Sequence, residues 1–239
     1  MAAPRGGELP AGRRVVLHVA RRDRARPFID GVVLTRSPWM AFSHGEQLAV
    51  PLIIGSNTWE GSLIQYASIG QKGRELADSA SVKELYRQET LNEDERAQRL
   101  FGDIVFVAPA RWIARMQARL APSWLYRFGY LHEGQRGKLP GVPHGGEIPY
   151  VFDTLGRSYG TPRNALSQDD IRMASTVADC WAAFARTGEP NCGLGAWNRY
   201  SRNHDNTMDI ENDGGHETTR LRATILDAVE RYFAPDRKQ

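Results

Sequence analysis

Apolar residues recur along this chain in two patterns, as short continuous runs and as longer stretches with helical spacing. Val50 to Ser56 is a short apolar run, and Trp124 to Tyr130 is a second run that is rich in aromatic residues. Continuous runs of this length are typical of strands that are buried on both faces of a parallel sheet. We therefore expect strands at both positions, and a short apolar segment at Ile148 to Phe152.

Helical spacing predicts several helices around these strands. The clearest is Asp169 to Arg186, whose apolar residues fall on one face and which stops at Gly188 and Pro190. Pro109 suits the first turn of a helix, and it opens an amphipathic stretch that reaches Leu120. Three further helices are expected at Ser79–Glu89, Glu93–Leu100 and Thr218–Phe233.

The order of these elements, a strand followed by helices and then the same again, indicates an α/β layered domain. Two strands are too few for a complete doubly wound sheet, so the pattern indicates only part of such a domain. Residues 1–26 are rich in Arg, Gly and Ala and have no apolar periodicity. We expect them to form a loosely ordered tail, and residues 27–239 to form the domain.

The positive charge of the chain is concentrated in that tail. Residues 1–26 hold seven arginines and two acidic residues, whereas the whole chain carries a net charge of only +3. The body is therefore mildly acidic and lacks the basic stripe of a nucleic-acid-binding surface. The chain has no run of about 18 apolar residues and no clear signal peptide. These observations predict no membrane partner and, by default, a cytoplasmic location.

The cysteines and histidines indicate no metal site or cofactor. The six histidines form no pair at helical spacing and no cluster with cysteine, which argues against zinc. Cys180 lies in the helical pattern beside Trp181, so a buried free thiol is favoured over a disulfide with Cys192. The acidic stretch from Asp205 to Asp213 lacks the spacing of a calcium loop and is interpreted as a solvated loop.

Two loops that follow the predicted strands carry candidate catalytic residues. Glu60 comes about four residues after the first strand, and His144 lies on a glycine-rich loop after the second. Active sites of parallel α/β sheets form beyond the carboxyl ends of the strands. A carboxylate that orients a histidine is two thirds of a hydrolytic triad, and in α/β-hydrolases the acid precedes the histidine along the chain, as here. A solvated glutamate and an unrelated histidine are the alternative interpretation of this pattern.

A series of short motifs resembles the second half of type-B carboxylesterases, the cholinesterase-like branch of the α/β-hydrolases. The motifs keep the order of that family: Arg26–Gly31, Val50–Asn57, Trp59–Gly61, Gly102–Pro109, Gly141–Phe152, Trp181–Asn191, Trp197 and Tyr200. The resemblance covers roughly residues 26–235 and implies the C-terminal portion of an α/β-hydrolase fold. It also implies a serine esterase that acts on small carboxylic esters without a cofactor, with Glu60 as the triad acid and His144 as the base.

The chain departs from that family in one respect that concerns activity. The nucleophile motif of the family lies upstream of the acid loop, but no Gly-x-Ser-x-Gly precedes Glu60. The resemblance therefore implies an ester hydrolase whose serine and oxyanion motif are absent from this chain, and an N-terminal half as the missing partner. The alternative is a non-catalytic protein, either a truncated product or a cholinesterase-like binding or adhesion module.

One Gly-x-Ser-x-Gly does occur, at Gly156–Gly160, after His144, Gly145 and Gly146. Together these residues mimic an oxyanion loop and a nucleophile elbow. Each of those elements follows its own parallel strand, and a parallel crossover needs a dozen or more residues. Gly145 and Gly156 are too close for that, and no helix begins directly after Ser158. A glycine-rich surface loop is therefore the favoured interpretation.

Overall fold

A four-stranded mixed sheet organises the structure, a computed structural model that describes residues 29–65, 70–157 and 162–233. The strand order is β1-β2-β3-β4. The first three strands run parallel, and β4 is antiparallel to β3. The bounds of the strands are β1 Leu52–Asn57, β2 Ser123–Phe128, β3 Asn206–Glu211 and β4 Gly214–Thr219.

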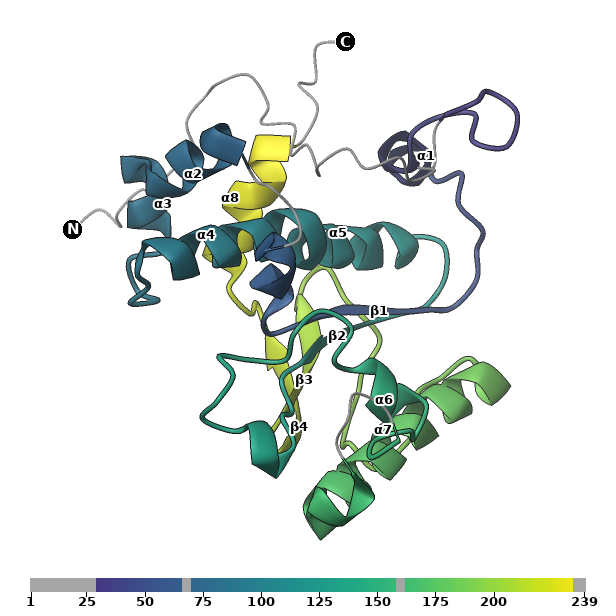
Figure 1. Cartoon of the computed structure of the whole chain (residues 1–239). Coiled ribbons are helices and arrows are strands. Elements are labelled where there is room, and N and C mark those ends of the chain that lie inside the picture. The colour runs from purple at the N-terminus through teal and green to yellow at the C-terminus, as the bar shows by residue number, and fades with distance from the viewer. Residues whose placement is uncertain (1–28, 66–69, 158–161, 234–239) are drawn as a thin grey trace, which may run out of the picture.

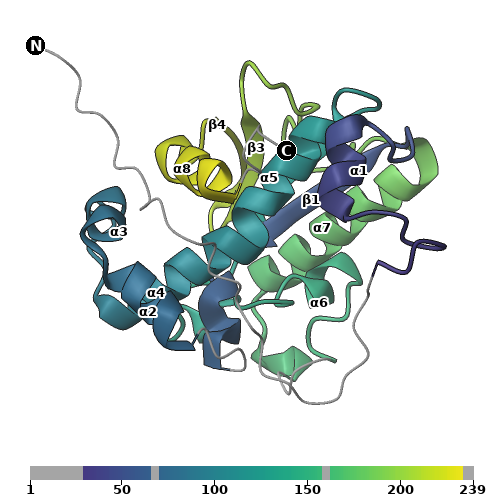
Figure 2. The same cartoon turned by 90° about the horizontal axis from the view of Figure 1, so that it is seen from above.

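Helices cover both faces of this sheet (Figure 1). Helices α4, α5 and α8 lie on one side, and α6 and α7 lie on the other (Figures 1 and 2). The bounds of the helices are α1 Pro38–His44, α2 Gly70–Asp78, α3 Ala80–Leu85, α4 Glu93–Gly102, α5 Ala108–Gln117, α6 Ile148–Val151, α7 Gln168–Thr187 and α8 Ala223–Phe233. Shorter helical segments are η1 Glu60–Gln65, η2 Asp103–Val107, η3 Glu133–Gln135 and η4 Arg163–Ala165. No helix among the described residues is long and apolar enough to cross a bilayer.

The two strands predicted from the apolar runs are confirmed as adjacent and parallel. Their register pairs Leu52 with Ser123 and Asn57 with Phe128. Side chains of β1 alternate between the two faces, so that Ile53 packs against the α7 side and Ile54 against the α5 side. Packing on both faces explains why the consecutive residues Ile53 and Ile54 are both apolar.

The interpretation of Asp205–Asp213 as a solvated loop is wrong, because this segment forms β3. Met208 and Ile210 are 1% and 0% exposed and alternate with polar residues, which is the period of a strand. The acidic side chain of Asp209 is paired with Arg127 on the neighbouring strand. A two-residue connection then leads into β4, and for this reason α8 begins at Ala223 and not at Thr218.

The helix predicted from Pro109 is α5, with Pro109 in its first turn, but no loop separates it from the preceding helix. Helix α4 continues into α5 through the π-helical segment η2, where the backbone N–H of Ala108 donates to the carbonyl oxygen of Asp103. Proline has no N–H to donate, and a regular α-helix would place its ring against the carbonyl of the residue four positions earlier. A wider π turn just before Pro109 is one of the known ways to include proline in a continuous helix.

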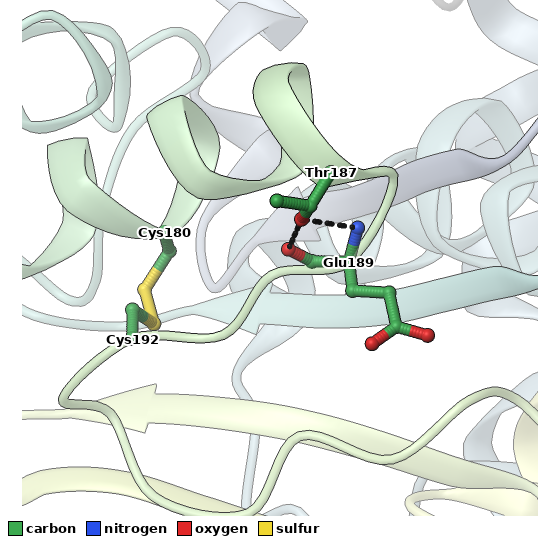
Figure 3. The surroundings of a disulfide bond; sticks show 4 residues. All are labelled: Cys180, Thr187, Glu189 and Cys192. Atoms are coloured by element: carbon green, nitrogen blue, oxygen red, sulfur yellow. Dashed lines mark hydrogen bonds between the residues drawn. A yellow bond between two sulfur atoms is a disulfide. The ribbon is translucent and has the colours of Figure 1, made fainter.

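Cys180 and Cys192 form a disulfide, so the prediction of a free buried thiol is wrong (Figure 3). Helix α7 ends at Gly188, whose left-handed backbone (φ 76°) turns the chain back along the helix. This reversal brings the Cα atoms of the two cysteines to 4.8 Å. Next to it, the hydroxyl of Thr187 accepts the backbone N–H of Glu189 and donates to the carbonyl oxygens of Ala183 and Glu189.

The expected tail, residues 1–26, lies outside the described residues. The division into a tail and a domain at residues 27–239 therefore stays a prediction.

Candidate active site

Two loops extend the parallel pairing of β1 and β2 beyond the carboxyl ends of these strands. The backbone N–H of Thr58 donates to the carbonyl oxygen of Phe128 (3.0 Å), and that of Trp59 donates to Val142 (2.9 Å). The N–H of Val142 in turn donates to the Thr58 hydroxyl (2.9 Å). Trp59 and Pro143 form an isolated parallel bridge. This pairing brings together the two loops that the sequence identifies as carriers of catalytic residues.

Glu60 and His144 meet at the end of this pairing. Oε2 of Glu60 lies 2.6 Å from Nδ1 of His144, and Oε1 of Glu60 accepts the backbone N–H of Asn57 at 2.7 Å. Glu60 is 6% exposed, whereas the His144 side chain is 41% exposed. An ionised carboxylate only accepts hydrogen bonds, so the neutral imidazole carries its proton on Nδ1. Nε2 is then left with a free lone pair, which is the form that a general base requires.

Burial is the main electrostatic influence on the Glu60 carboxyl group. It raises the pKa of the Glu60 carboxyl above its ordinary value, because a desolvated carboxylate is costly. The hydrogen bonds from the Asn57 backbone and from His144 act in the opposite direction, while the nearby charge of Glu147 adds to the increase. The site therefore keeps a buried carboxylate that depends on its two hydrogen-bond donors.

The continuous helix formed by α4 and η2 supports both residues from one side. A Cβ atom on Gly61 would lie 2.3 Å from the carbonyl oxygen of Gln98, so the acid loop sits directly against the α4 backbone. A Cβ atom on Gly102 would lie 3.2 Å from Cβ of Glu60. One turn further, the Phe106 ring packs against the His144 ring, with centroids 4.7 Å apart. Helix and π-helical segment together form a platform beneath the pair.

A cavity of ≈ 270 Å³ lies beneath the acid loop, between the sheet and the helices of the α4–α8 side. It is lined by Glu60 but not by His144. Four arginines line it, and each is paired with a carboxylate; the pairs are Arg99–Glu89, Arg111–Asp205, Arg127–Asp209 and Arg222–Asp103. Because these charges are neutralised, none of the arginines that line the cavity in the described part of the chain is left unpaired for an anionic ligand.

The remaining polar contacts of the two loops were not foreseen from the sequence. The backbone N–H of His144 donates to the Ser62 hydroxyl (3.0 Å), and the Asn57 amide contacts both Pro143 and Glu147. Within the described residues, no serine, threonine or cysteine side chain is hydrogen-bonded to the His144 ring, and no three His, Cys, Asp or Glu side chains converge as metal ligands. The serine of the Gly156–Gly160 motif, Ser158, lies outside the described residues.

Comparison with known proteins establishes the family and the fold to which this chain belongs. The model of the carboxylesterase family matches residues 80–227, which is more than half of the chain. The chain therefore belongs to the carboxylesterase family, and its fold is that of the α/β-hydrolases.

The relatives that match this chain include two esterases and neuroligin-2. The chain is 25% identical over 205 residues to the para-nitrobenzyl esterase of Bacillus subtilis (strain 168), a match that covers 79% of this chain and 41% of the relative. It is 29% identical to the fumonisin B1 esterase of Sphingopyxis macrogoltabida, over 74% of this chain and 35% of the relative. It is also 30% identical to neuroligin-2 of Homo sapiens, over 69% of this chain and 24% of the relative.

Solved structures show the same architecture. A structure named PNB esterase matches with a TM-score of 0.67 and 19% identity, over 85% of this chain and 43% of that chain. A thermophilic PNB esterase matches with a TM-score of 0.66 and 20% identity, over 82% and 41%. The chain thus spans about two fifths of the length of the PNB esterases that it matches.

Proposed function

We propose that this chain supplies the acid and base of a serine esterase, with Glu60 as the acid and His144 as the base. The observation that carries the proposal is the 2.6 Å contact between Oε2 of Glu60 and Nδ1 of His144, on loops that extend two parallel strands. This is the geometry by which a carboxylate fixes the tautomer of a catalytic histidine and stabilises the imidazolium that forms during the reaction.

The proposed substrate is a small carboxylic ester. A serine hydroxyl gives its proton to Nε2 of His144 as its oxygen attacks the acyl carbon. The imidazolium then returns that proton to the leaving alcohol, and an acyl-enzyme remains. Water repeats the sequence, so that it transfers one proton to His144, releases the carboxylic acid and restores the serine. The route uses neither a metal nor a cofactor.

The serine and the oxyanion donors belong, in this proposal, to a segment that adds alongside β1. Within the described part of the chain, β1 pairs only with β2, so its other edge has no strand partner. A strand edge of this kind is a template for further pairing. The N-terminal part of the family's domain is the expected segment, because the nucleophile elbow must lie within hydrogen-bond reach of Nε2 of His144.

A complementation assay tests the proposal. The purified full chain is assayed with a p-nitrophenyl ester, alone and after it is mixed with the N-terminal part of the para-nitrobenzyl esterase. We expect slow or no turnover by the chain alone, because the loss of one oxyanion donor already costs about 10²–10³ in rate. Turnover should appear in the mixture and disappear with His144→Ala. The exposed His204 provides the matched control, since His204→Ala should leave the mixture active.

Two results would overturn parts of this assignment. Saturable turnover by the chain alone that is abolished by Ser158→Ala would identify Gly156–Gly160 as the nucleophile motif. Turnover in the mixture that persists in His144→Ala would remove the histidine from the mechanism. A mixture that binds the ester or a protein ligand without any turnover would favour the binding-module alternative.

A further inference from the structure

Asn57 contacts both loops of the candidate site. It is the last residue of β1 and is 3% exposed. Its backbone N–H donates to Oε1 of Glu60 (2.7 Å), and its side-chain Nδ2 donates to the carbonyl oxygen of Pro143 (2.9 Å). Nδ2 also donates to the carboxylate of Glu147. One residue thereby bonds to the acid and to both ends of the turn that carries His144.

The orientation of this amide follows from its partners. The Pro143 carbonyl and the Glu147 carboxylate both accept hydrogen bonds, so the NH₂ group must face them and both of its protons are used. Oδ1 then has no partner among the described residues. A buried acceptor without a donor is unfavourable, which indicates that the two donated bonds determine the side chain at this position.

These two bonds hold the turn at its two ends. Pro143 immediately precedes His144, and its carbonyl oxygen also accepts the backbone N–H of Gly146 (2.8 Å), which closes the turn. Glu147 follows three residues after His144 and immediately precedes α6. With Pro143 and Glu147 both fixed to Asn57, the backbone of His144 has a defined distance from Glu60.

We propose that Asn57 is the positioning residue of this site, which holds the His144 turn so that Nδ1 meets the Glu60 carboxylate. This role rests on the proposed pairing of Glu60 and His144 in catalysis, and Asn57 itself touches no substrate. Asn57 and Pro143 are 86 residues apart along the chain, so the amide side chain links two loops that are not neighbours in the sequence.

The substitution Asn57→Asp tests this role with almost no change in shape. It replaces the NH₂ donor by an oxygen that faces two acceptors, so the turn should move away from Glu60. Glu147→Gln, added to Asn57→Asp, returns an N–H donor to one of these contacts while keeping the new charge. Asn57→Ser is a smaller variant that retains at most one of the two donated bonds.

Asn206 provides a matched control. It is 4% exposed, and its Nδ2 also donates to backbone carbonyl oxygens, those of Asn198 and Arg199, and to the carboxylate of Glu217. Asn206→Asp therefore repeats the same chemical change at a buried position on β3 that has no contact with Glu60 or His144.

The measurement is the ¹⁵N spectrum of the His144 ring in the full chain, which reports how much neutral imidazole carries its proton on Nδ1. Thermal unfolding of each variant confirms that the chain is folded. In the parent chain we expect the Nδ1–H form to dominate. Asn57→Asp and Asn57→Ser should lower the ratio of Nδ1–H to Nε2–H by roughly tenfold, as expected for the loss of a charge-assisted hydrogen bond. The double variant should recover most of the ratio, and Asn206→Asp should leave it unchanged.

The outcomes separate this proposal from the proposed function. A folded Asn57→Ser variant with the parent ratio, or a double variant that recovers nothing, would overturn the positioning role while leaving the Glu60–His144 pair intact. A parent chain without the Nδ1–H form, and a Glu60→Gln variant with the same spectrum, would instead overturn the pair itself.

Discussion

Oε2 of Glu60 lies 2.6 Å from Nδ1 of His144, although the glutamate is almost fully buried and the imidazole is partly exposed. The acid is therefore desolvated by the fold, while the base remains open on one side. This asymmetry is what a site needs if a nucleophile must reach the histidine while water is kept from the carboxylate. It also has measurable consequences for stability.

The stability of the chain should respond to pH through Glu60. Burial raises the pKa of Glu60 above its ordinary value of 4.5, so the folded chain binds more protons than the unfolded chain between these two values. The stability that the protonated form contributes is present below the ordinary pKa and is lost as pH rises through the raised pKa. Glu60→Gln is neutral throughout and lacks this loss.

We therefore expect the difference in urea midpoint, Glu60→Gln minus parent, to increase as pH rises from about 4 to about 7. Glu84 is an exposed surface glutamate, and Glu84→Gln serves as the control for the removal of a surface carboxylate. A difference for Glu60→Gln that does not change with pH would contradict the desolvation of this carboxylate.

The ring contact between Phe106 and His144 should limit access to the imidazole. The two ring centroids are 4.7 Å apart, and Phe106 lies on the π-helical segment η2. Phe106→Ala would remove the ring that covers one side of the imidazole. We expect diethyl pyrocarbonate to modify His144 several-fold faster in this variant, with Phe106→Tyr close to the parent rate. Equal rates in all three proteins would show that Phe106 does not shield the histidine.

Gly61 should be among the positions least tolerant of a methyl group. Its Cβ atom would lie 2.3 Å from the backbone carbonyl oxygen of Gln98, and a helix backbone has little freedom to move. Gly61→Ala should lower the free energy of unfolding by about 1–3 kcal/mol, the usual cost of overpacking. Gly193 is the comparison, because its nearest neighbour would be a Thr176 methyl group at 3.4 Å. Urea unfolding of both variants distinguishes a local clash from a general effect of alanine.

The disulfide between Cys180 and Cys192 should stabilise the chain against unfolding. It closes a loop with a sequence separation of 12, and loops of that order are expected to contribute about 3 kcal/mol. Reductant should therefore lower the melting temperature of the parent chain. The double variant Cys180→Ser, Cys192→Ser should melt near the reduced parent and should not respond to reductant. A parent chain whose melting temperature is unaffected by complete reduction would contradict this contribution.

The pair of β1 and β2 could be predicted from the sequence because consecutive apolar residues of these strands, such as Trp124 and Leu125, pack on opposite faces of the sheet. The two polar loops that follow stand out against these apolar runs. The same logic brought Glu60 and His144 to one edge of the sheet, where the structure also finds them. Family motifs added the expected roles, which no contact in the structure tests by itself.

The parts that sequence analysis missed depend on partners that are distant along the chain. The acidic residues of β3 suggested solvent exposure, but Asp209 is paired with Arg127 from the neighbouring strand, 82 residues earlier. The alternation of Met208 and Ile210 with polar residues, followed by an Asn-Asp-Gly turn, was the available signal. The disulfide required knowledge that the chain reverses after α7, and the role of Asn57 required the juxtaposition of two loops.

The π-helical segment η2 also determines which way the helix after it faces. Each residue of a helix advances the direction of its side chain by about 100°, and a π turn contains one residue more than an α turn. Helix α4 directs Ala97, Leu100 and Phe101 into the cluster shared with α2, α3 and α8, whereas α5 directs Ala110 and Ala114 toward Leu125 of the sheet.

The extra residue of the π turn therefore changes the direction in which the side chains of α5 point relative to those of α4. A deletion of one residue within η2 would rotate α5 relative to α4, so that Ala114 no longer faced the sheet. It would also place the Pro109 ring against the carbonyl oxygen four positions earlier. The number of residues between Gly102 and Ala108, more than their chemical identity, therefore sets the angle by which α5 is rotated relative to α4. Helix α4 packs against the acid loop, and α5 covers the strands.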